Sequence, residues 1–253
     1  MKHQRPPKSQ VTAVFDDLAT GWTELYRTRP DFRARLEAVG ALLATVLRRY
    51  DQPLVLDLGG GTGIFANIAS QWAGHVVVVD RSQAMAQTGV RDTEAASRRI
   101  ADAGLAADRG SVSRLVGDAS SVPLLPSRFD VIVCVAVLEW LTDVDRAIAE
   151  IADLLSPDGV VVFSVPRPQS LFRRLGPVID GAASLLGLVR DAGWARSRRY
   201  SAARPHGSSP PWREALKRHG LRVTSSEDLA FGTSGWRAWL LPTQLVVAAR
   251  SEP

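Results

Sequence analysis

The chemical information of this 253-residue chain is concentrated in seven consecutive residues, Asp57-Leu58-Gly59-Gly60-Gly61-Thr62-Gly63. Glycines alternate at positions 59, 61 and 63, directly behind the apolar run at residues 54–56. Glycine adopts positive φ at low steric cost, and its missing side chain lets a ligand approach the main chain. Backbone N–H groups that converge at a helix start bind polar parts of ligands. The pattern therefore predicts a loop that binds a small-molecule cofactor.

The spacing of the glycines separates two kinds of cofactor. A dinucleotide loop has the pattern G-x-G-x-x-G, but the position of its third glycine holds Ile64 here. A second acid, Asp80, ends the valine-rich run 75–79, about 20 residues beyond the glycines. A carboxylate in that place accepts hydrogen bonds from a ribose diol. We therefore expect an adenosine-containing cofactor, with capping of a helix that begins near Ser82 as the alternative role of Asp80.

The loop, which reads Asp-x-Gly-x-Gly-x-Gly, resembles motif I of the class I S-adenosylmethionine-dependent methyltransferases. The resemblance covers about residues 50–166 and implies S-adenosyl-L-methionine as the cofactor, with its methionine part above the loop. It implies that Asp80 holds the ribose and that Asp118 accepts from the adenine amine. The remaining cofactor residues implied by the resemblance are Asp57, Gly59, Gly61, Gly63, Arg81, Ala119, Val135 and Tyr26.

The apolar runs that position these residues predict an α/β fold, a Rossmann-like doubly wound sheet of seven strands as in that family. A helix is expected over residues 64–72, another from about residue 82, and a third over 211–219. The family arrangement makes the last two strands antiparallel. The expected strands lie at residues 54–56, 75–79, 129–136, 160–165, 221–224 and 244–249, and a further strand, third in chain order, is expected to end at residues 116–119.

The N-terminal segment, residues 1–50, is expected to form a helical lid on a core of residues 51–253. Residues 11–27 carry apolar side chains at mostly helical spacing, which predicts one amphipathic helix containing Phe15, Trp22 and Tyr26. A second helix is expected from Asp31, taken as its N-cap. The aromatic pattern resembles the leading helix of the ubiquinone-biosynthesis O-methyltransferases, which covers the cofactor. The alternative is that these aromatic residues only anchor the packing.

Residues 166–212 interrupt the core between the fifth strand and the last helix. Their apolar residues recur at helical spacing and are surrounded by arginines. This pattern predicts a helical cap over a hydrophobic pocket for an apolar or anionic substrate. Peripheral contact with a membrane is the alternative, because basic amphipathic helices also lie at membrane interfaces.

Composition and charge narrow the class of partner. No run of about 18 apolar residues predicts a transmembrane segment, so we expect a cytoplasmic protein. The single cysteine, Cys134, falls in an expected buried strand and reads as a core residue. The net charge of +5 conceals an acidic middle between basic flanks. Because the loop after the fourth strand lacks the motifs of DNA methyltransferases, we expect a small-molecule substrate and no nucleic acid.

The residues available for catalysis are few. Glu139 stands where the related enzymes have the Glu of Leu-Glu-His, and Trp140 replaces their histidine. Glu139 and His206 are therefore the candidate general bases, with Tyr200 or no base at all as the alternatives, and no metal site is expected. We expect O-methylation of an apolar aromatic or isoprenoid-like compound. The alternatives are C- or N-methylation, a non-catalytic scaffold that only binds the cofactor, and nicotinamide oxidoreduction.

Overall fold

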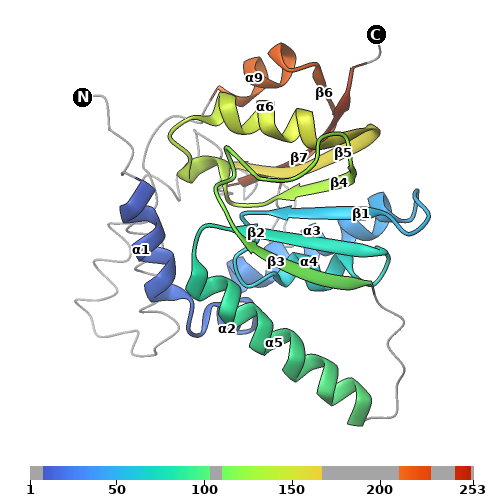
Figure 1. The fold of residues 1–253 in the computed structure, drawn as a ribbon. Coiled ribbons are helices and arrows are strands. Elements are labelled where there is room, and N and C mark those ends of the chain that lie inside the picture. Colours follow the sequence, from blue (N-terminus) through green and yellow to red (C-terminus); the bar gives the residue numbers. More distant parts are fainter. Residues whose placement is uncertain (1–7, 103–109, 167–210, 229–242, 252–253) are drawn as a thin grey trace.

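The computed structural model describes residues 8–102, 110–166, 211–228 and 243–251. They form one seven-stranded sheet in the order β3-β2-β1-β4-β5-β7-β6, with helices on both faces (Figure 1). The first five strands run parallel, and β7 pairs antiparallel with both β5 and β6. This is the expected doubly wound sheet. The strands are β1 Leu54–Leu58, β2 His75–Asp80, β3 Ser111–Val116, β4 Phe129–Cys134, β5 Leu155–Pro166, β6 Leu221–Asp228 and β7 Thr243–Arg250.

The helices begin and end close to the expected positions, with one difference at the N-terminus. They are α1 Lys8–Leu18, α2 Trp22–Thr28, α3 Pro30–Leu47, α4 Ile64–Ala69, α5 Gln83–Asp102, the 3-10 turn η1 Leu138–Trp140, α6 Val144–Leu154 and α9 Trp212–Arg218.

The prediction of a single N-terminal helix over residues 11–27 is wrong. The chain forms two helices there, because Gly21 adopts a left-handed conformation with a φ of 81° that an α-helix does not continue through. The helix α3 starts at Pro30, and Arg29 rather than Asp31 is its N-cap. Proline is well suited to this first position, since its missing N–H has no acceptor there.

Alternate side chains of the central strands divide the core into two layers. One layer joins Val55, Val76 and Val131 to α1, α2, α3, α4 and the start of α5. The other joins Leu56, Val77 and Ile132 to α6 and α9. Such burial on both faces is why the strands read as continuous apolar runs. Asp57 and Asp80 belong to the first layer by this alternation, so their carboxyl groups face the side covered by α1 and α2.

Cys134 lies fully buried in the second layer, as expected of a core cysteine. Burial raises the pKa of its thiol far above the ordinary value, which excludes a thiolate at neutral pH.

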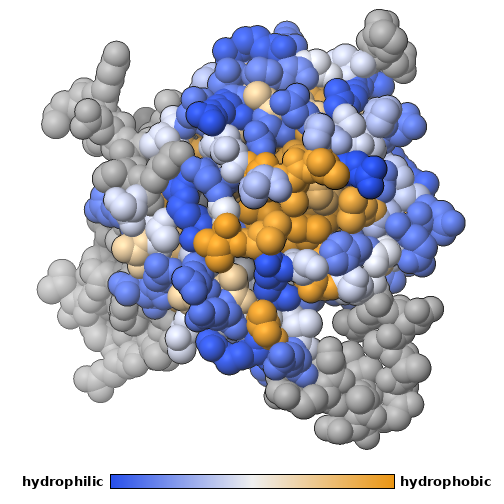
Figure 2. All heavy atoms as spheres, in the orientation of Figure 1, coloured by the Kyte–Doolittle hydropathy of each residue, from blue (hydrophilic) through white to orange (hydrophobic). Residues whose placement is uncertain are grey.

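Helices cover the two faces unequally. Among the described residues, α6, α9 and the short η1 pack on the second layer. Figure 2 shows apolar side chains gathered over the middle of the sheet, on the face between α6 and α5. None of the described helices combines the length and the apolar composition of a membrane-spanning segment.

The carboxylate of Asp130 connects strands β1, β4 and β5 below the loop of residues 57–63, the glycine loop. Its Oδ2 accepts from the Leu54 backbone N at 2.9 Å, and its Oδ1 accepts from Ser156 Oγ at 3.2 Å. These bonds fix the start of β1 against β4 and β5, and β1 leads into the glycine loop.

We predict that Asp130→Ala lowers the free energy of unfolding by about 1–3 kcal/mol, because it leaves the Leu54 N–H without its charged acceptor. Urea denaturation followed by circular dichroism measures the change. Asp153→Ala, which removes an exposed carboxylate on α6, is the matched control and should change stability by less than about 0.5 kcal/mol. Equal stability of Asp130→Ala and the control contradicts this role of Asp130.

Candidate functional site

The glycine loop passes between β1 and α4 through a space that excludes side chains. Gly59 has a φ of 71°, and a Cβ built there would lie 2.5 Å from Val137 Cγ2. The Gly59 N–H donates to the Val79 carbonyl at 2.6 Å, which holds the loop against the end of β2. Gly61 also has positive φ, at 57°, and lines the cavity described below. The expected glycine turn is therefore confirmed in detail, and it presents main chain to a ligand.

Asp80 joins this loop to the start of α5. Its Oδ2 accepts from the Gly61 N–H at 2.8 Å, and its Oδ1 accepts from the Ser82 N–H at 2.8 Å. Ser82 Oγ in turn accepts from the Met85 N–H at 3.0 Å, so Ser82 caps the helix. Burial raises the pKa of the Asp80 carboxyl, and the two N–H donors oppose that rise. Each oxygen keeps a second lone pair for a ligand hydroxyl.

Asp57 is the more deeply buried carboxyl of the site, with 1% of its surface exposed. Its Oδ2 accepts from the Ala66 N–H at 3.1 Å. A Cβ at Gly60 would lie 2.5 Å from its Cγ, so a side chain at position 60 would displace this buried carboxyl group. Burial raises the pKa of Asp57 to about 7, and the neighbouring Asp80 adds to the rise. The Ala66 N–H and the cation of Arg114, which lies behind the loop on β3, oppose it.

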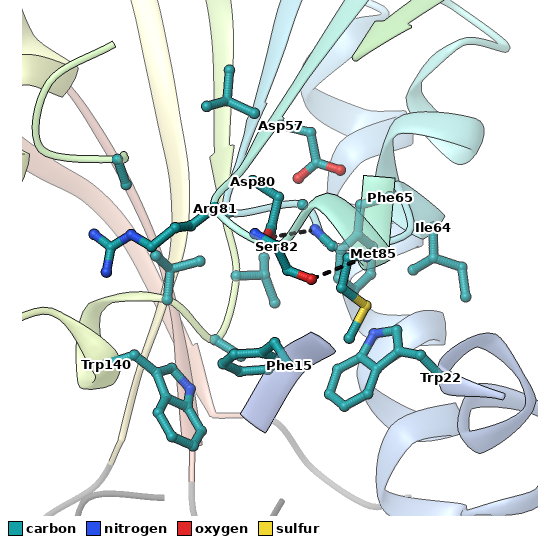
Figure 3. Close-up of a pocket in the computed structure, with 18 of the residues that line it drawn as sticks. Phe15, Trp22, Asp57, Ile64, Phe65, Asp80, Arg81, Ser82, Met85 and Trp140 are labelled. Atoms are coloured by element: carbon teal, nitrogen blue, oxygen red, sulfur yellow. Dashed lines mark hydrogen bonds between the residues drawn. The ribbon is translucent and has the colours of Figure 1, made fainter. Parts of the chain in front are cut away.

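A cavity opens above these two carboxyl groups, at the carboxyl ends of β1, β2 and β4 (Figure 3). Its floor is the glycine loop with Asp57 and Asp80, and its roof comes from α1 and α2. In a parallel sheet a ligand binds where the strand order reverses, at the carboxyl ends of the strands. Here that reversal falls between β1 and β4, so the cavity occupies the ligand-binding position of the fold.

The roof of the cavity is aromatic. The rings of Phe15 and Trp140 lie edge to face with centroids 5.0 Å apart, and Phe15 and Trp22 do the same at 5.9 Å. In Figure 3 Phe15 lies between Trp140 on one side and Trp22 on the other, facing the carboxyl groups. Such pairs pack tightly over a large apolar area. The cavity therefore has a polar floor and an apolar roof.

Three side-chain contacts hold the two roof helices to the glycine loop and to α5 with its N-cap. Ser82 Oγ donates to Asp16 Oδ1 on α1 at 2.6 Å. Thr23 Oγ1 on α2 donates to Asp92 Oδ2 on α5 at 2.6 Å and lies 3.1 Å from Thr62 Oγ1 of the glycine loop. The helix α2 thus contacts the glycine loop directly, and α1 contacts Ser82 beside it.

Most of the cofactor residues named from the sequence meet in this cavity. Eight line it: Tyr26, Asp57, Gly59, Gly61, Asp80, Arg81, Ala119 and Val135. Gly63 stands just outside it as the N-cap of α4, with a φ of 74°. Asp118 Oδ1 forms an ion pair with Arg81 Nη2 at 2.8 Å, and Asp118 lies beside the lining residues Gly117 and Ala119.

Of the two candidate bases, Glu139 and His206, the structure describes only Glu139. Glu139 is 3% exposed and does not line the cavity, although its neighbour Trp140 does. His206 lies outside the described residues, as do most of the expected cap residues 166–212.

The sequence did not point to several residues of the site. Arg35, Phe65 and Met85 line the cavity, and Arg114 lies behind the loop. One signal for Arg35 was present, because it occupies an apolar position of α3, three residues after Phe32 and four before Val39. A charged residue in the buried register of a helix marks a possible ligand contact.

A protein-family model described as a methyltransferase domain matches residues 29–226. Demethylmenaquinone methyltransferase of Thermobifida fusca is 30% identical over 169 residues, which cover 66% of each chain. The ubiquinone/menaquinone biosynthesis C-methyltransferase UbiE of Vibrio vulnificus is 31% identical over 190 residues, 70% of this chain and 67% of the relative. The matched segment thus spans about two thirds of the length of these relatives.

Solved structures agree on the fold. The magnesium protoporphyrin IX methyltransferase of Synechocystis with bound S-adenosylhomocysteine superposes with a TM-score of 0.65 at 16% identity, covering 96% of this chain and 99% of that one. The N-methyltransferase NodS of Bradyrhizobium japonicum, also in complex with S-adenosylhomocysteine, gives 0.57 at 17% identity, with 90% and 91% covered. The chain therefore belongs to the class I S-adenosylmethionine-dependent methyltransferases, in the group that resembles the ubiquinone-biosynthesis enzymes, and its cofactor is S-adenosylmethionine.

Proposed function

We propose that the protein transfers the methyl group of S-adenosylmethionine to an oxygen of a small apolar compound, aromatic or isoprenoid-like. The observation that carries this proposal is the aromatic roof of Phe15, Trp22 and Trp140 over the polar floor of the cavity. A roof of this kind excludes water and stacks on flat or apolar molecules.

The floor of the cavity fits the three parts of the cofactor. Asp80 has lone pairs for the ribose diol and is oriented by two N–H donors. Gly117 and Ala119 offer a surface without bulk to the adenine ring, and Asp118 lies beside them for its amine. Gly61 and Asp57 remain for the methionine part, where the main chain is open: a Cβ at Gly61 would find only Trp22 Nε1 and Met85 Sδ near it, at 3.7 and 3.8 Å.

When bound, the cofactor supplies an already activated methyl group, so the protein has to align donor and acceptor and exclude water. The helices α1 and α2 serve as the lid, fastened by the bonds from Ser82 to Asp16 and from Thr23 to Asp92. Residues 1–50 and 166–212 remain the proposed lid and cap segments of the chain. A base that removes the acceptor proton would be Glu139 or His206.

Carbon methylation is the second candidate function. It is favoured by the names of two relatives, a demethylmenaquinone methyltransferase and a C-methyltransferase of quinone biosynthesis. Both reactions need an electron-rich acceptor, so a hydroxylated aromatic ring fits either one. Incubation with isotopically labelled S-adenosylmethionine and a panel of phenols, quinols and isoprenoid alcohols tests the proposal. The position of the label, determined by NMR, distinguishes transfer to oxygen from transfer to carbon, and methylation of carbon alone contradicts the first candidate.

We predict that Asp80→Ala weakens S-adenosylhomocysteine binding by about 1–3 kcal/mol, the range for losing hydrogen bonds to a charged group. Isothermal titration calorimetry measures the affinity. Asp51→Ala removes an exposed carboxylate ahead of β1 and should leave the affinity unchanged. If Asp80→Ala binds as tightly as the wild type, Asp80 does not hold the ribose.

The raised pKa of Asp57 predicts a pH-dependent affinity. Below pH 7 the carboxyl is mostly neutral, and the ammonium group of the ligand binds better to its ionised form. Binding therefore releases a proton, and the affinity for S-adenosylhomocysteine should rise roughly tenfold from about pH 6 to about pH 8. In Asp57→Asn this dependence should disappear. Calorimetry at several pH values measures it, and the same slope in both proteins contradicts the assignment.

We predict that Glu139→Gln lowers the turnover number at least tenfold and leaves S-adenosylhomocysteine affinity within about twofold, the pattern of a lost base. The measurement combines methyl-transfer rates on the best acceptor of the panel with calorimetry. The variant keeps the size of the side chain, so packing changes little. Full activity in Glu139→Gln removes Glu139 from the reaction.

A further inference from the structure

An arginine lies behind the glycine loop, outside the cavity. Arg114 on β3 is half-buried and does not line the cavity wall. Two glycines make room for it. A Cβ at Gly63 would lie 3.1 Å from its Nη2, and a Cβ at Gly89 would lie 2.9 Å from its Nε. The guanidinium group therefore lies between the end of the loop and α5.

Hydrogen bonds account for only part of this placement. Arg114 Nη2 donates to Thr93 Oγ1 at 2.8 Å, and Thr93 Oγ1 in turn donates to the Gly89 carbonyl at 2.8 Å. The Nε of Arg114 is buried and has no hydrogen-bond partner among the described residues. A buried donor without an acceptor costs free energy, so hydrogen bonding alone does not explain an arginine at this position.

Two carboxylates attract the guanidinium group. Burial lowers the pKa of Arg114, and the charges of Asp57 and Asp92 oppose that change. Asp92 Oδ2 also accepts from Thr23 Oγ1 of α2 at 2.6 Å, which connects this acid to a roof helix of the cavity. Asp57 lies on the other strand of interest, β1, and is buried beneath the loop. A buried carboxylate is costly unless a cation compensates it.

The charged groups around Asp57 differ in their effect on it. Burial is the largest cause of its raised pKa, and the backbone N–H that it accepts from α4 opposes the rise. Asp80 at the end of β2 adds to the rise, and Arg114 opposes it. Arg35 of α3 lines the same cavity, and the thiol of Cys134 on β4 is neutral at pH 7. Arg114 is thus the cation that acts on Asp57 from behind the loop.

Given the proposed function, we propose that Arg114 is a positioning residue of the cofactor site, which supplies the counter-charge of the buried Asp57 carboxylate from behind the glycine loop. It touches neither cofactor nor acceptor, because it does not line the cavity. Its charge acts through Asp57. The missing side chains of Gly63 and Gly89 serve this role, since a Cβ at either position would crowd the guanidinium group.

Titration of Asp57 in the ligand-free, full-length protein tests the proposal. Aspartate is labelled with ¹³C at Cγ, the Asp57 resonance is assigned with Asp57→Asn, and its shift is followed by NMR as the pH is raised. The wild type should titrate at about pH 7. Arg114→Gln removes the charge and keeps an N–H donor for Thr93, and it should raise the midpoint by about 1 pH unit. Arg114→Lys restores a cation and should return the midpoint to within about 0.5 unit of the wild type.

Arg91→Gln is the matched control, because it removes an exposed arginine of α5 that contacts Thr88 on the same helix. It should leave the midpoint of Asp57 unchanged. An unchanged midpoint in Arg114→Gln overturns the proposal, and so does an equal rise in Arg114→Gln and Arg114→Lys. If Arg114→Gln does not fold, Arg114→Met takes its place. A wild-type midpoint above about pH 8 overturns the proposal without any variant, because it leaves no effect for a counter-charge.

Binding of S-adenosylhomocysteine, measured by calorimetry, separates this inference from the proposed function. Arg114→Gln should bind it about fivefold more weakly than the wild type at about pH 7 and within about twofold at about pH 8.5, because the neutral fraction of Asp57 shrinks as the pH rises. A loss of affinity that is equal at both pH values is a structural effect and overturns the role of the charge. A wild type that binds no S-adenosylhomocysteine contradicts the proposed function alone, since the NMR titration requires no ligand.

Discussion

The site depends on the hydrogen bond from the Gly61 N–H to the Asp80 carboxylate. This bond fixes the loop after β1 to the acid at the end of β2. It forms only because the loop lies flat between Val137 and Asp57, where side chains at Gly59 and Gly60 would collide at 2.5 Å. Two strands that are neighbours in the sheet thereby present one continuous polar floor. Every other part of the cavity is placed relative to this floor.

The aromatic residues of the roof serve both the packing of the core and the wall of the cavity. Phe15, Trp22 and Tyr26 are both anchors of the core and walls of the cavity, so the two readings of these aromatic residues are compatible. The break at Gly21 makes this possible. A straight helix would present one stripe of side chains, whereas the turn lets α1 approach Trp140 while α2 approaches Phe65. The contacts of Asp16 with Ser82 and of Thr23 with Asp92 then hold both helices to the floor.

Most of the fold could be predicted from the sequence, because its strands are buried on both faces and appear as short valine-rich runs. The glycine loop and the role of its partner Asp80 could be predicted from the sequence, because binding such a cofactor requires particular residues at a particular spacing. The break between α1 and α2 could not, since a glycine in a helical pattern adopts positive φ only where the surrounding packing demands it. The early start of β5 depends on the pairing of Phe129 with Leu155 across a bulge, a long-range contact without a local signal.

Arg35 was missed for a related reason. Charged residues are mostly exposed, and only the tertiary structure shows that this one lies on the buried face of α3 against Phe32. Glu139 differs from Arg35: its place after β4 predicts a role beside the acceptor, and in the structure its neighbour Trp140 is the residue that lines the cavity. Positions within a tight turn are set by its geometry, which spacing along the chain does not reveal.

A crystal structure with S-adenosylhomocysteine would show whether Asp80 and the glycine loop hold the adenosine methyl donor. We expect both ribose hydroxyls within hydrogen-bonding distance of the Asp80 carboxylate and the homocysteine part above Gly61. A ribose bound away from Asp80, or a ligand outside this cavity, would contradict this expectation.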